Sequence, residues 1–159
     1  MPVANLESMR ALLADTTAVL ERLTALLEEE AERLAAQQVD GIEQLLADKQ
    51  NALQAAHEAD QKRCQLLTEA GFATGGEGMR AYLAACGDAM LATAWQHIIE
   101  LLQRAQLLNE ANGRIIHRSL DQVTRTLAIL RGDAAAEAAT YGPSGQTIAG
   151  PGRGSLSRA

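Results

Sequence analysis

Three histidines and two cysteines are the side chains of this chain best suited to hold a metal ion or act as nucleophile or base. In helical bundles, catalytic metals are usually held by facing helices that each carry a Glu-x-x-His pair. None of His57, His97 and His117 follows a glutamate by three residues, and His97 with Glu100 has only the reversed order. The pattern therefore predicts surface or rim histidines and no metal centre.

The remaining candidates for chemistry are two cysteines and a glycine cluster. Cys64 and Cys86 have neither CxxC nor zinc-site spacing, so we expect buried, reduced thiols. The run Gly75-Gly76-Glu77-Gly78 lacks the Lys and Ser/Thr of a phosphate-binding loop and follows no strand pattern. The sequence therefore indicates neither an enzyme nor a cofactor.

A more informative group is Asn109, Asn112 and Gly113, which lie inside a long helical pattern. Asn and Gly are poor helix formers, costing roughly 0.7 and 1 kcal/mol relative to Ala. An asparagine buried at a helix seam can fix register, and a glycine lets another backbone approach closely. Two interpretations stay open: the trio locks its helix against the chain's own helices, or it contacts a partner. For Gly113 we expect the intramolecular role.

The composition limits the function classes. A formal charge of −6 over 159 residues argues against a nucleic-acid binder, which needs Lys and Arg to meet phosphates. No run approaches the roughly eighteen apolar residues of a membrane span, and no signal peptide is visible. We expect a cytoplasmic protein that does not insert into membranes.

Periodicity predicts an all-α fold, an elongated antiparallel three-helix bundle or coiled coil, with helices at about 4–38, 41–70 and 88–131. Leucine recurs every seven residues in the first helix, at Leu6, Leu13, Leu20, Leu27 and Leu34. The alternate seam positions are Met9, Thr16 and Leu23, until Glu30 interrupts that second series. Asp40 and Glu43 resemble a capping box for the second helix, and Asp88 is a candidate N-cap for the last.

Three further expectations concern the ends of these helices. Residues 79–86 form either a short helix of their own or the start of the last one. Residues 1–132 form the helical domain, and residues 133–159, rich in Gly, Ser and Pro, form a flexible tail. Glutamates near the end of the first helix either meet the late arginines of the last helix or stay solvated. The glutamates are Glu28, Glu29, Glu30 and Glu32, and the arginines are Arg114, Arg118, Arg125 and Arg131.

Three elements of the sequence together resemble the FlgN family of flagellar export chaperones. The first is Leu108-Asn109-x-x-Asn112-Gly113 followed by Ile115-Ile116. The second, Tyr141-Gly142-Pro143-Ser144-Gly145-Gln146-Thr147, is similar to the family's C-terminal Tyr-Gly-x-x-Gly-Gln-Thr element. The third is the order Lys49-Gln50, Leu53, Arg63 and Leu66-Leu67 in the second helix.

The resemblance implies a non-enzymatic chaperone of the flagellar type III export system. Such chaperones bind the C-terminal helical segments of hook–filament junction proteins and deliver them to the cytoplasmic domain of the export-gate protein. They can also contact the export ATPase complex. Carried over residue by residue, client binding falls on Leu108, Asn109, Asn112, Ile116, Leu120, Val123 and Leu127, and gate binding on Tyr141, Gly142, Gly145 and Gln146.

A structural coiled-coil protein without an export client is the alternative. Its leucine heptads would then serve self-association. For the chaperone we expect a monomer or a weak homodimer.

Overall fold

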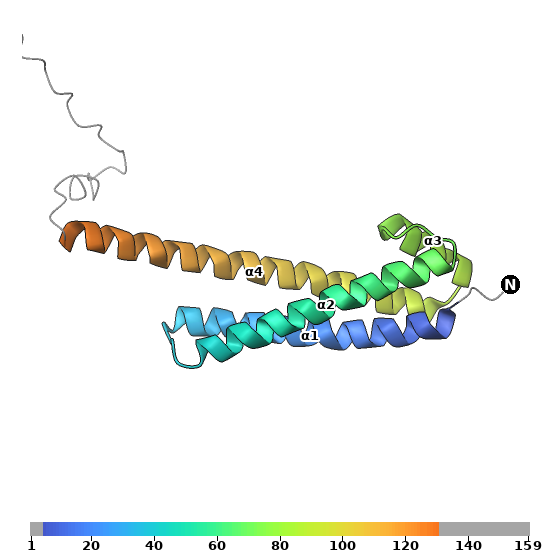
Figure 1. Ribbon diagram of the computed structural model, residues 1–159, viewed down its shortest axis with the longest axis horizontal. Helices are drawn as coiled ribbons and strands as arrows, with labels where there is room; N and C mark the ends of the chain where they lie inside the picture. Colours follow the sequence, from blue (N-terminus) through green and yellow to red (C-terminus); the bar gives the residue numbers. More distant parts are fainter. Residues whose placement is uncertain (1–4, 131–159) are drawn as a thin grey trace, which may run out of the picture. The chain divides into compact units, whose positions relative to one another are not determined.

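The computed structural model describes residues 5–130 and contains four helices there: α1 (Leu6–Ala35), α2 (Ile42–Glu69), α3 (Gly76–Cys86) and α4 (Ala89–Leu130) (Figure 1). No strand occurs in this range. The all-α class and the helical bundle are confirmed, and α3 is a separate short helix. The predicted tail, 133–159, lies outside the described residues.

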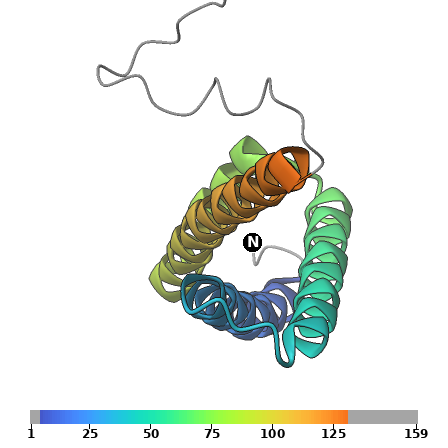
Figure 2. The same cartoon turned by 90° about the vertical axis from the view of Figure 1, so that its left-hand side faces the viewer.

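The chain divides into two units, residues 1–115 and 116–159. In the first unit, α1 and α2 are antiparallel, because their contacts join early residues of one helix to late residues of the other. Asn5 Nδ2 donates to Glu69 Oε2 at 3.0 Å, and Arg22 Nη2 lies 3.7 Å from Asp48 Oδ2. Viewed along the helices, α1 lies between α2 and the first turns of α4 (Figure 2).

The leucine heptads of α1 form the centre of the core, as predicted. Leu13, Leu20 and Leu27 are fully buried, while the end positions Leu6 and Leu34 are half-buried. Apolar side chains from the other three helices complete this core, among them Leu45, Leu67, Met79, Tyr82, Leu91 and Ile98. Burial of these side chains is the main stabilising contribution to the bundle.

The turn between α1 and α2 differs from the predicted capping box. The N-cap of α2 is Gly41 at φ +74°, and no side chain caps it, so the role expected for Asp40 is wrong. Arg33 instead donates from its guanidinium to the backbone carbonyl oxygen of Asp40. Glycine adopts this left-handed conformation without the strain that a side chain brings.

Two buried side chains pack α3 into the core, and the backbone of Ala73 approaches the helix closely at Gly78. Tyr82 and Met79 are fully buried, and the ring of Phe72 meets that of Tyr82 edge to face at 5.4 Å. Burial, with a smaller contribution from the neighbouring Cys86 thiol, raises the pKa of Tyr82 to about 12. A Cβ atom at Gly78 would lie 1.7 Å from the carbonyl oxygen of Ala73, so only glycine fits there.

The two cysteines differ slightly from their prediction. Cys64 and Cys86 are free thiols, but both are half-buried rather than buried. Cys64 Sγ donates to the Thr74 carbonyl oxygen at 3.8 Å, and Cys86 is the last residue of α3.

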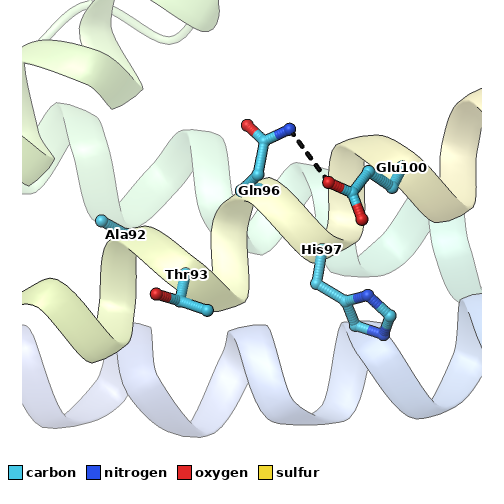
Figure 3. Close-up of a pocket in the computed structure, with 5 residues that line it drawn as sticks. All are labelled: Ala92, Thr93, Gln96, His97 and Glu100. Atoms are coloured by element: carbon cyan, nitrogen blue, oxygen red, sulfur yellow. Dashed lines mark hydrogen bonds between the residues drawn. The ribbon is translucent and has the colours of Figure 1, made fainter.

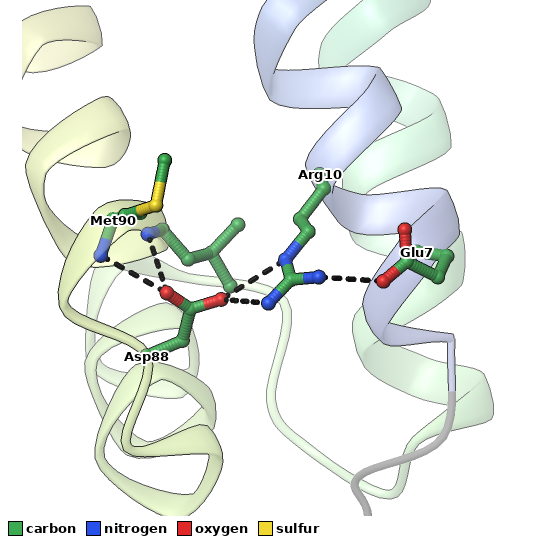
Figure 4. Close-up of polar contacts among 5 residues, drawn as sticks. Glu7, Arg10, Asp88 and Met90 are labelled. Carbon is green, nitrogen blue, oxygen red and sulfur yellow. Dashed lines mark hydrogen bonds and ion pairs between the residues drawn. The ribbon is translucent and has the colours of Figure 1, made fainter.

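Asp88 caps α4, as predicted, and also joins it to α1 (Figure 4). Its Oδ1 accepts hydrogen bonds from the backbone N–H groups of Met90 at 3.0 Å and Leu91 at 3.1 Å. Its Oδ2 accepts from Arg10 Nη2 at 2.6 Å, and Arg10 Nη1 donates to Glu7 Oε1 at 2.6 Å. The Arg10 hydrogen bond, followed by that from Leu91, lowers the pKa of Asp88.

Over the described part of the chain, none of the helices combines the length and the apolar character that crossing a bilayer requires.

Candidate functional site

The apolar face of α4 is largely buried between Leu91 and Ala105, apart from Leu102, which is 47% exposed. Leu91, Ile98 and Ala105, spaced by seven residues, are buried in the core formed with α1 and α2. Trp95 on the same face is half-buried, and the Arg63 guanidinium carbon lies 5.3 Å from the centre of its ring. This part of α4 therefore functions as an ordinary core helix.

Polar pairs along the edge of this face join α4 to α1. Arg104 Nη2 donates to Glu28 Oε1, and His97 Nε2 lies 3.6 Å from Glu21 Oε1. Residue numbers rise together along the two helices, so α1 and α4 are parallel, as the three-helix bundle predicts.

Three of the four glutamates near the end of α1 pair with residues other than the late arginines of α4, of which Arg131 lies outside the described residues. Glu28 pairs with Arg104. Glu29 pairs with Arg33 one turn along its own helix, and Glu30 pairs with Lys49 of α2. These glutamates therefore stabilise the bundle locally.

A polar cluster inside the described bundle consists of Asn112, Glu30 and Lys49, one residue from each long helix. Asn112 Nδ2 donates to the Leu27 carbonyl oxygen at 2.9 Å and to Glu30 Oε2 at 2.8 Å. Lys49 Nζ donates to Glu30 Oε1 at 2.6 Å. Asn112 is 1% exposed and Glu30 2%.

Such a cluster fixes the register of three helices, because sliding any one of them would leave a buried polar group unpaired. Asn112 Oδ1 is buried and meets no hydrogen-bond donor among the described residues. In this structure the amide of Asn112 serves the bundle itself, and client binding by Asn112 stays a prediction.

Gly113 does not have the close-packing role that we expected within the chain. A Cβ atom built on Gly113 meets nothing within 4 Å. No backbone of the described residues approaches it, so internal packing does not explain a glycine here. Its neighbours in the predicted site differ in cover: Leu108 is half-buried against the core, and Asn109 is exposed.

The second unit contains the rest of the predicted client-binding residues. Ile116 is 40% exposed, Leu120 58%, Val123 56% and Leu127 44%. Their spacing of four, three and four residues places them on one side of α4. We call these four residues the exposed stripe.

A shallow surface depression on α4 is lined by Ala92, Thr93, Gln96, His97 and Glu100 (Figure 3). Gln96 Nε2 donates to Glu100 Oε1 at 3.2 Å, while His97 turns toward α1. All five residues come from one helix, and His97 and Glu100 do not converge on a common point. The depression provides no arrangement for acid–base or metal chemistry, and the described residues contain no group of three potential metal ligands.

The residues predicted to bind the export gate, Tyr141, Gly142, Gly145 and Gln146, lie outside the described residues. Sequence reasoning missed that Glu30 joins Asn112 to Lys49. A signal was present, since Glu30 and Lys49 are charged residues on otherwise apolar seams.

Comparison with known proteins gives one family and one solved structure. The sequence profile of the FlgN protein family matches residues 1–148. A crystal structure of a protein described as a candidate FlgN flagella synthesis protein from Pseudomonas aeruginosa is similar, with 30% sequence identity and a TM-score of 0.64. The similarity covers 75% of this chain and 92% of that one. A search of curated proteins gives no match. The chain therefore belongs to the FlgN family of non-enzymatic flagellar proteins, and it acts in the assembly of the bacterial flagellum.

Proposed function

We propose that this protein is a cytoplasmic export chaperone of the flagellar type III system. It binds the C-terminal helical segments of hook–filament junction proteins and delivers them to the export gate. The observation that carries the proposal is the exposed stripe, four large apolar side chains on one side of α4. Membership of the FlgN family supports the same reading.

The stripe fits a helical client. Isolated large apolar residues are normal on protein surfaces, but a continuous row is typical of a docking site. An amphipathic helix places its own apolar residues at positions i, i+3, i+4 and i+7, which match the spacing of Ile116, Leu120, Val123 and Leu127. Binding would shield the client's apolar face until export.

Delivery is assigned to the C-terminal segment. A tyrosine offers a rigid aromatic body with a polar tip, which suits a pocket on the cytoplasmic domain of the export-gate protein. Tyr141, with Gly142, Gly145 and Gln146, would make this contact, and the export ATPase complex would be a second docking point. The substitution Tyr141→Ala should weaken gate binding and leave client binding intact. Equal gate binding by both forms would remove the segment from the mechanism.

Client binding can be tested by gel filtration with the purified C-terminal region of a junction protein. The wild-type chain should co-elute with it, and the double variant Leu120→Ser, Val123→Ser should not. The double variant Leu46→Ser, Leu53→Ser is a matched control, because these α2 residues are 45% and 44% exposed. Failure of the wild-type chain to bind either junction protein at micromolar concentration would overturn the chaperone assignment.

A self-associating structural coiled coil is the competing function, because the stripe could also pair two copies of the chain. Light scattering over a range of concentrations separates the two. A chaperone should keep the mass of a monomer or show weak dimerisation that the client displaces. A stable dimer that excludes the client would favour the structural protein.

A further inference from the structure

The exposed stripe has flanks that are almost free of charge. Successive residues of an α-helix are rotated by about 100°, so the four apolar residues occupy one narrow sector of α4. The residues bordering this sector are His117, Ser119, Thr124 and Thr126, of which only the histidine can ionise. The exposed charged residues of the segment lie on the opposite side of the helix and are Arg118, Asp121 and Arg125.

A partner can bury the threonine hydroxyl groups on these flanks without breaking their hydrogen bonds. Thr124 Oγ1 donates to the Leu120 carbonyl oxygen at 2.9 Å, and Thr126 Oγ1 donates to the Gln122 carbonyl oxygen at 2.9 Å. A polar group buried without a partner destabilises a complex, whereas these two hydroxyls already have one within their own helix. A partner can therefore cover the flanks without leaving either hydroxyl unpaired.

The buried part of α4 differs from the exposed stripe, because charged residues border its apolar row. Where α4 packs against α1, its borders carry Arg104 opposite Glu28 and His97 opposite Glu21. Charges that border an apolar seam select partner and register, as they do in coiled coils. The internal partner of α4 is thus matched by charge as well as by leucines.

Continuity along α4 indicates what kind of partner fits the exposed stripe. Over Leu91, Ile98 and Ala105 the apolar side of α4 is covered by the leucine-rich faces of neighbouring helices. From Ile116 to Leu127 the helix keeps an apolar row, and the only ionisable residue on its border is His117. A leucine-rich helix still fits this row, and nothing on its flanks discriminates between acidic and basic helices.

We infer that the exposed stripe binds its client helix without selection by charge. The occupant is an amphipathic helix whose apolar row, together with the residues bordering it, covers the stripe and its uncharged flanks. This inference rests on the proposed function and adds the recognition rule of its site. One such surface can hold clients that share an apolar row and differ in their bordering charges.

The first test is the salt dependence of binding. A fluorescently labelled peptide of a junction protein's C-terminal helix is titrated with the full chain at 50 and 500 mM NaCl. Contacts between exposed charges are strongly screened over this range, so charge-independent docking should change Kd by less than about twofold. A tenfold loss of affinity at high salt would overturn the inference.

The second test adds charge to the flanks. Thr124→Glu combined with Thr126→Glu should weaken peptide binding by about tenfold or more, because docking would bury two carboxylates. Gln122→Glu is the matched control on the far side of α4 and should leave Kd within about twofold. Glutamate is a better helix former than threonine, so both variants should remain folded, which circular dichroism checks.

The outcomes separate this inference from the proposed function. Absence of peptide binding by the wild-type chain overturns both. Peptide binding that Leu120→Ser abolishes, but that the double glutamate variant leaves unchanged, keeps the chaperone and overturns the uncharged-flank rule. Binding that is insensitive to salt and lost in the double glutamate variant supports both.

Discussion

Both parts of α4 carry an apolar row, but the row is buried in the first part and exposed in the second. Leu91, Ile98 and Ala105 are buried against α1 and α2, whereas the stripe from Ile116 to Leu127 is exposed. Asn112, which donates a hydrogen bond to the buried Glu30 of α1, lies between them in the sequence. The comparison shows that helical periodicity specifies where an apolar row runs, and that polar residues beside it specify which partner covers it.

The largest difference between the two parts should appear in stability. Ile98→Ala deletes a buried side chain from the core and should lower the free energy of unfolding by about 3–4 kcal/mol. Leu120→Ala, in the exposed stripe, should change it by less than about 0.5 kcal/mol. Urea unfolding followed by circular dichroism measures both. Similar losses in the two variants would mean that the stripe is covered within the free chain.

The polar cluster should have the next largest effect. Glu30→Ala removes the acceptor of both Lys49 and Asn112 and leaves two donors without their partner. We expect the free energy of unfolding to fall by about 3 kcal/mol. This value is at the lower end of the range for buried ion pairs, because Lys49 is 18% exposed and can turn toward water.

The surface pair of Arg33 with Glu29 is the control for Glu30. The variant Glu29→Ala should cost less than about 1 kcal/mol in the same urea experiment. Equal effects of Glu29→Ala and Glu30→Ala would show that burial of the cluster contributes nothing to stability.

The apolar row along α4 could be predicted from the sequence, but the point at which it ceases to be buried could not. Leucine periodicity located three long helices and their core, and the stripe was named residue by residue from the family resemblance. The cluster around Asn112 could not be predicted, because Glu30 is 82 positions from Asn112 and 19 from Lys49, and the three side chains meet only once three helices have packed. The capping of α2 was missed because Asp40 matches a capping pattern, whereas the turn adopts the left-handed conformation at Gly41.

A smaller effect is expected where α4 begins, at the pair of Asp88 with Arg10. The pKa of Asp88 is lowered in the folded protein, so its contribution to stability is present above the unfolded value of about 3.9. The contribution is lost as the pH falls through the folded pKa. The gap in unfolding free energy between wild type and Asp88→Asn should therefore be widest near pH 7 and narrow below about pH 4. A gap that stays constant between pH 7 and pH 3 would contradict this assignment.

The last prediction concerns Gly113, next to the buried Asn112. Alanine is a better helix former than glycine by about 1 kcal/mol in a helix interior. The added Cβ meets nothing within 4 Å, so Gly113→Ala should raise the free energy of unfolding by about 0.5–1 kcal/mol. Urea unfolding of the two forms measures this gain. A loss of stability would mean that a neighbouring segment approaches Gly113 in solution.

The same variant bears on why a glycine occurs at this position at all. Within the described residues its backbone is approached by nothing, so the glycine weakens the helix with no packing gain in return. If Gly113→Ala is more stable but binds the junction-protein peptide less tightly, the open space above Gly113 receives a client side chain. If binding is unchanged, client contact begins further along α4, at the exposed stripe. The part of α4 up to Asn112 then serves only the packing of the bundle.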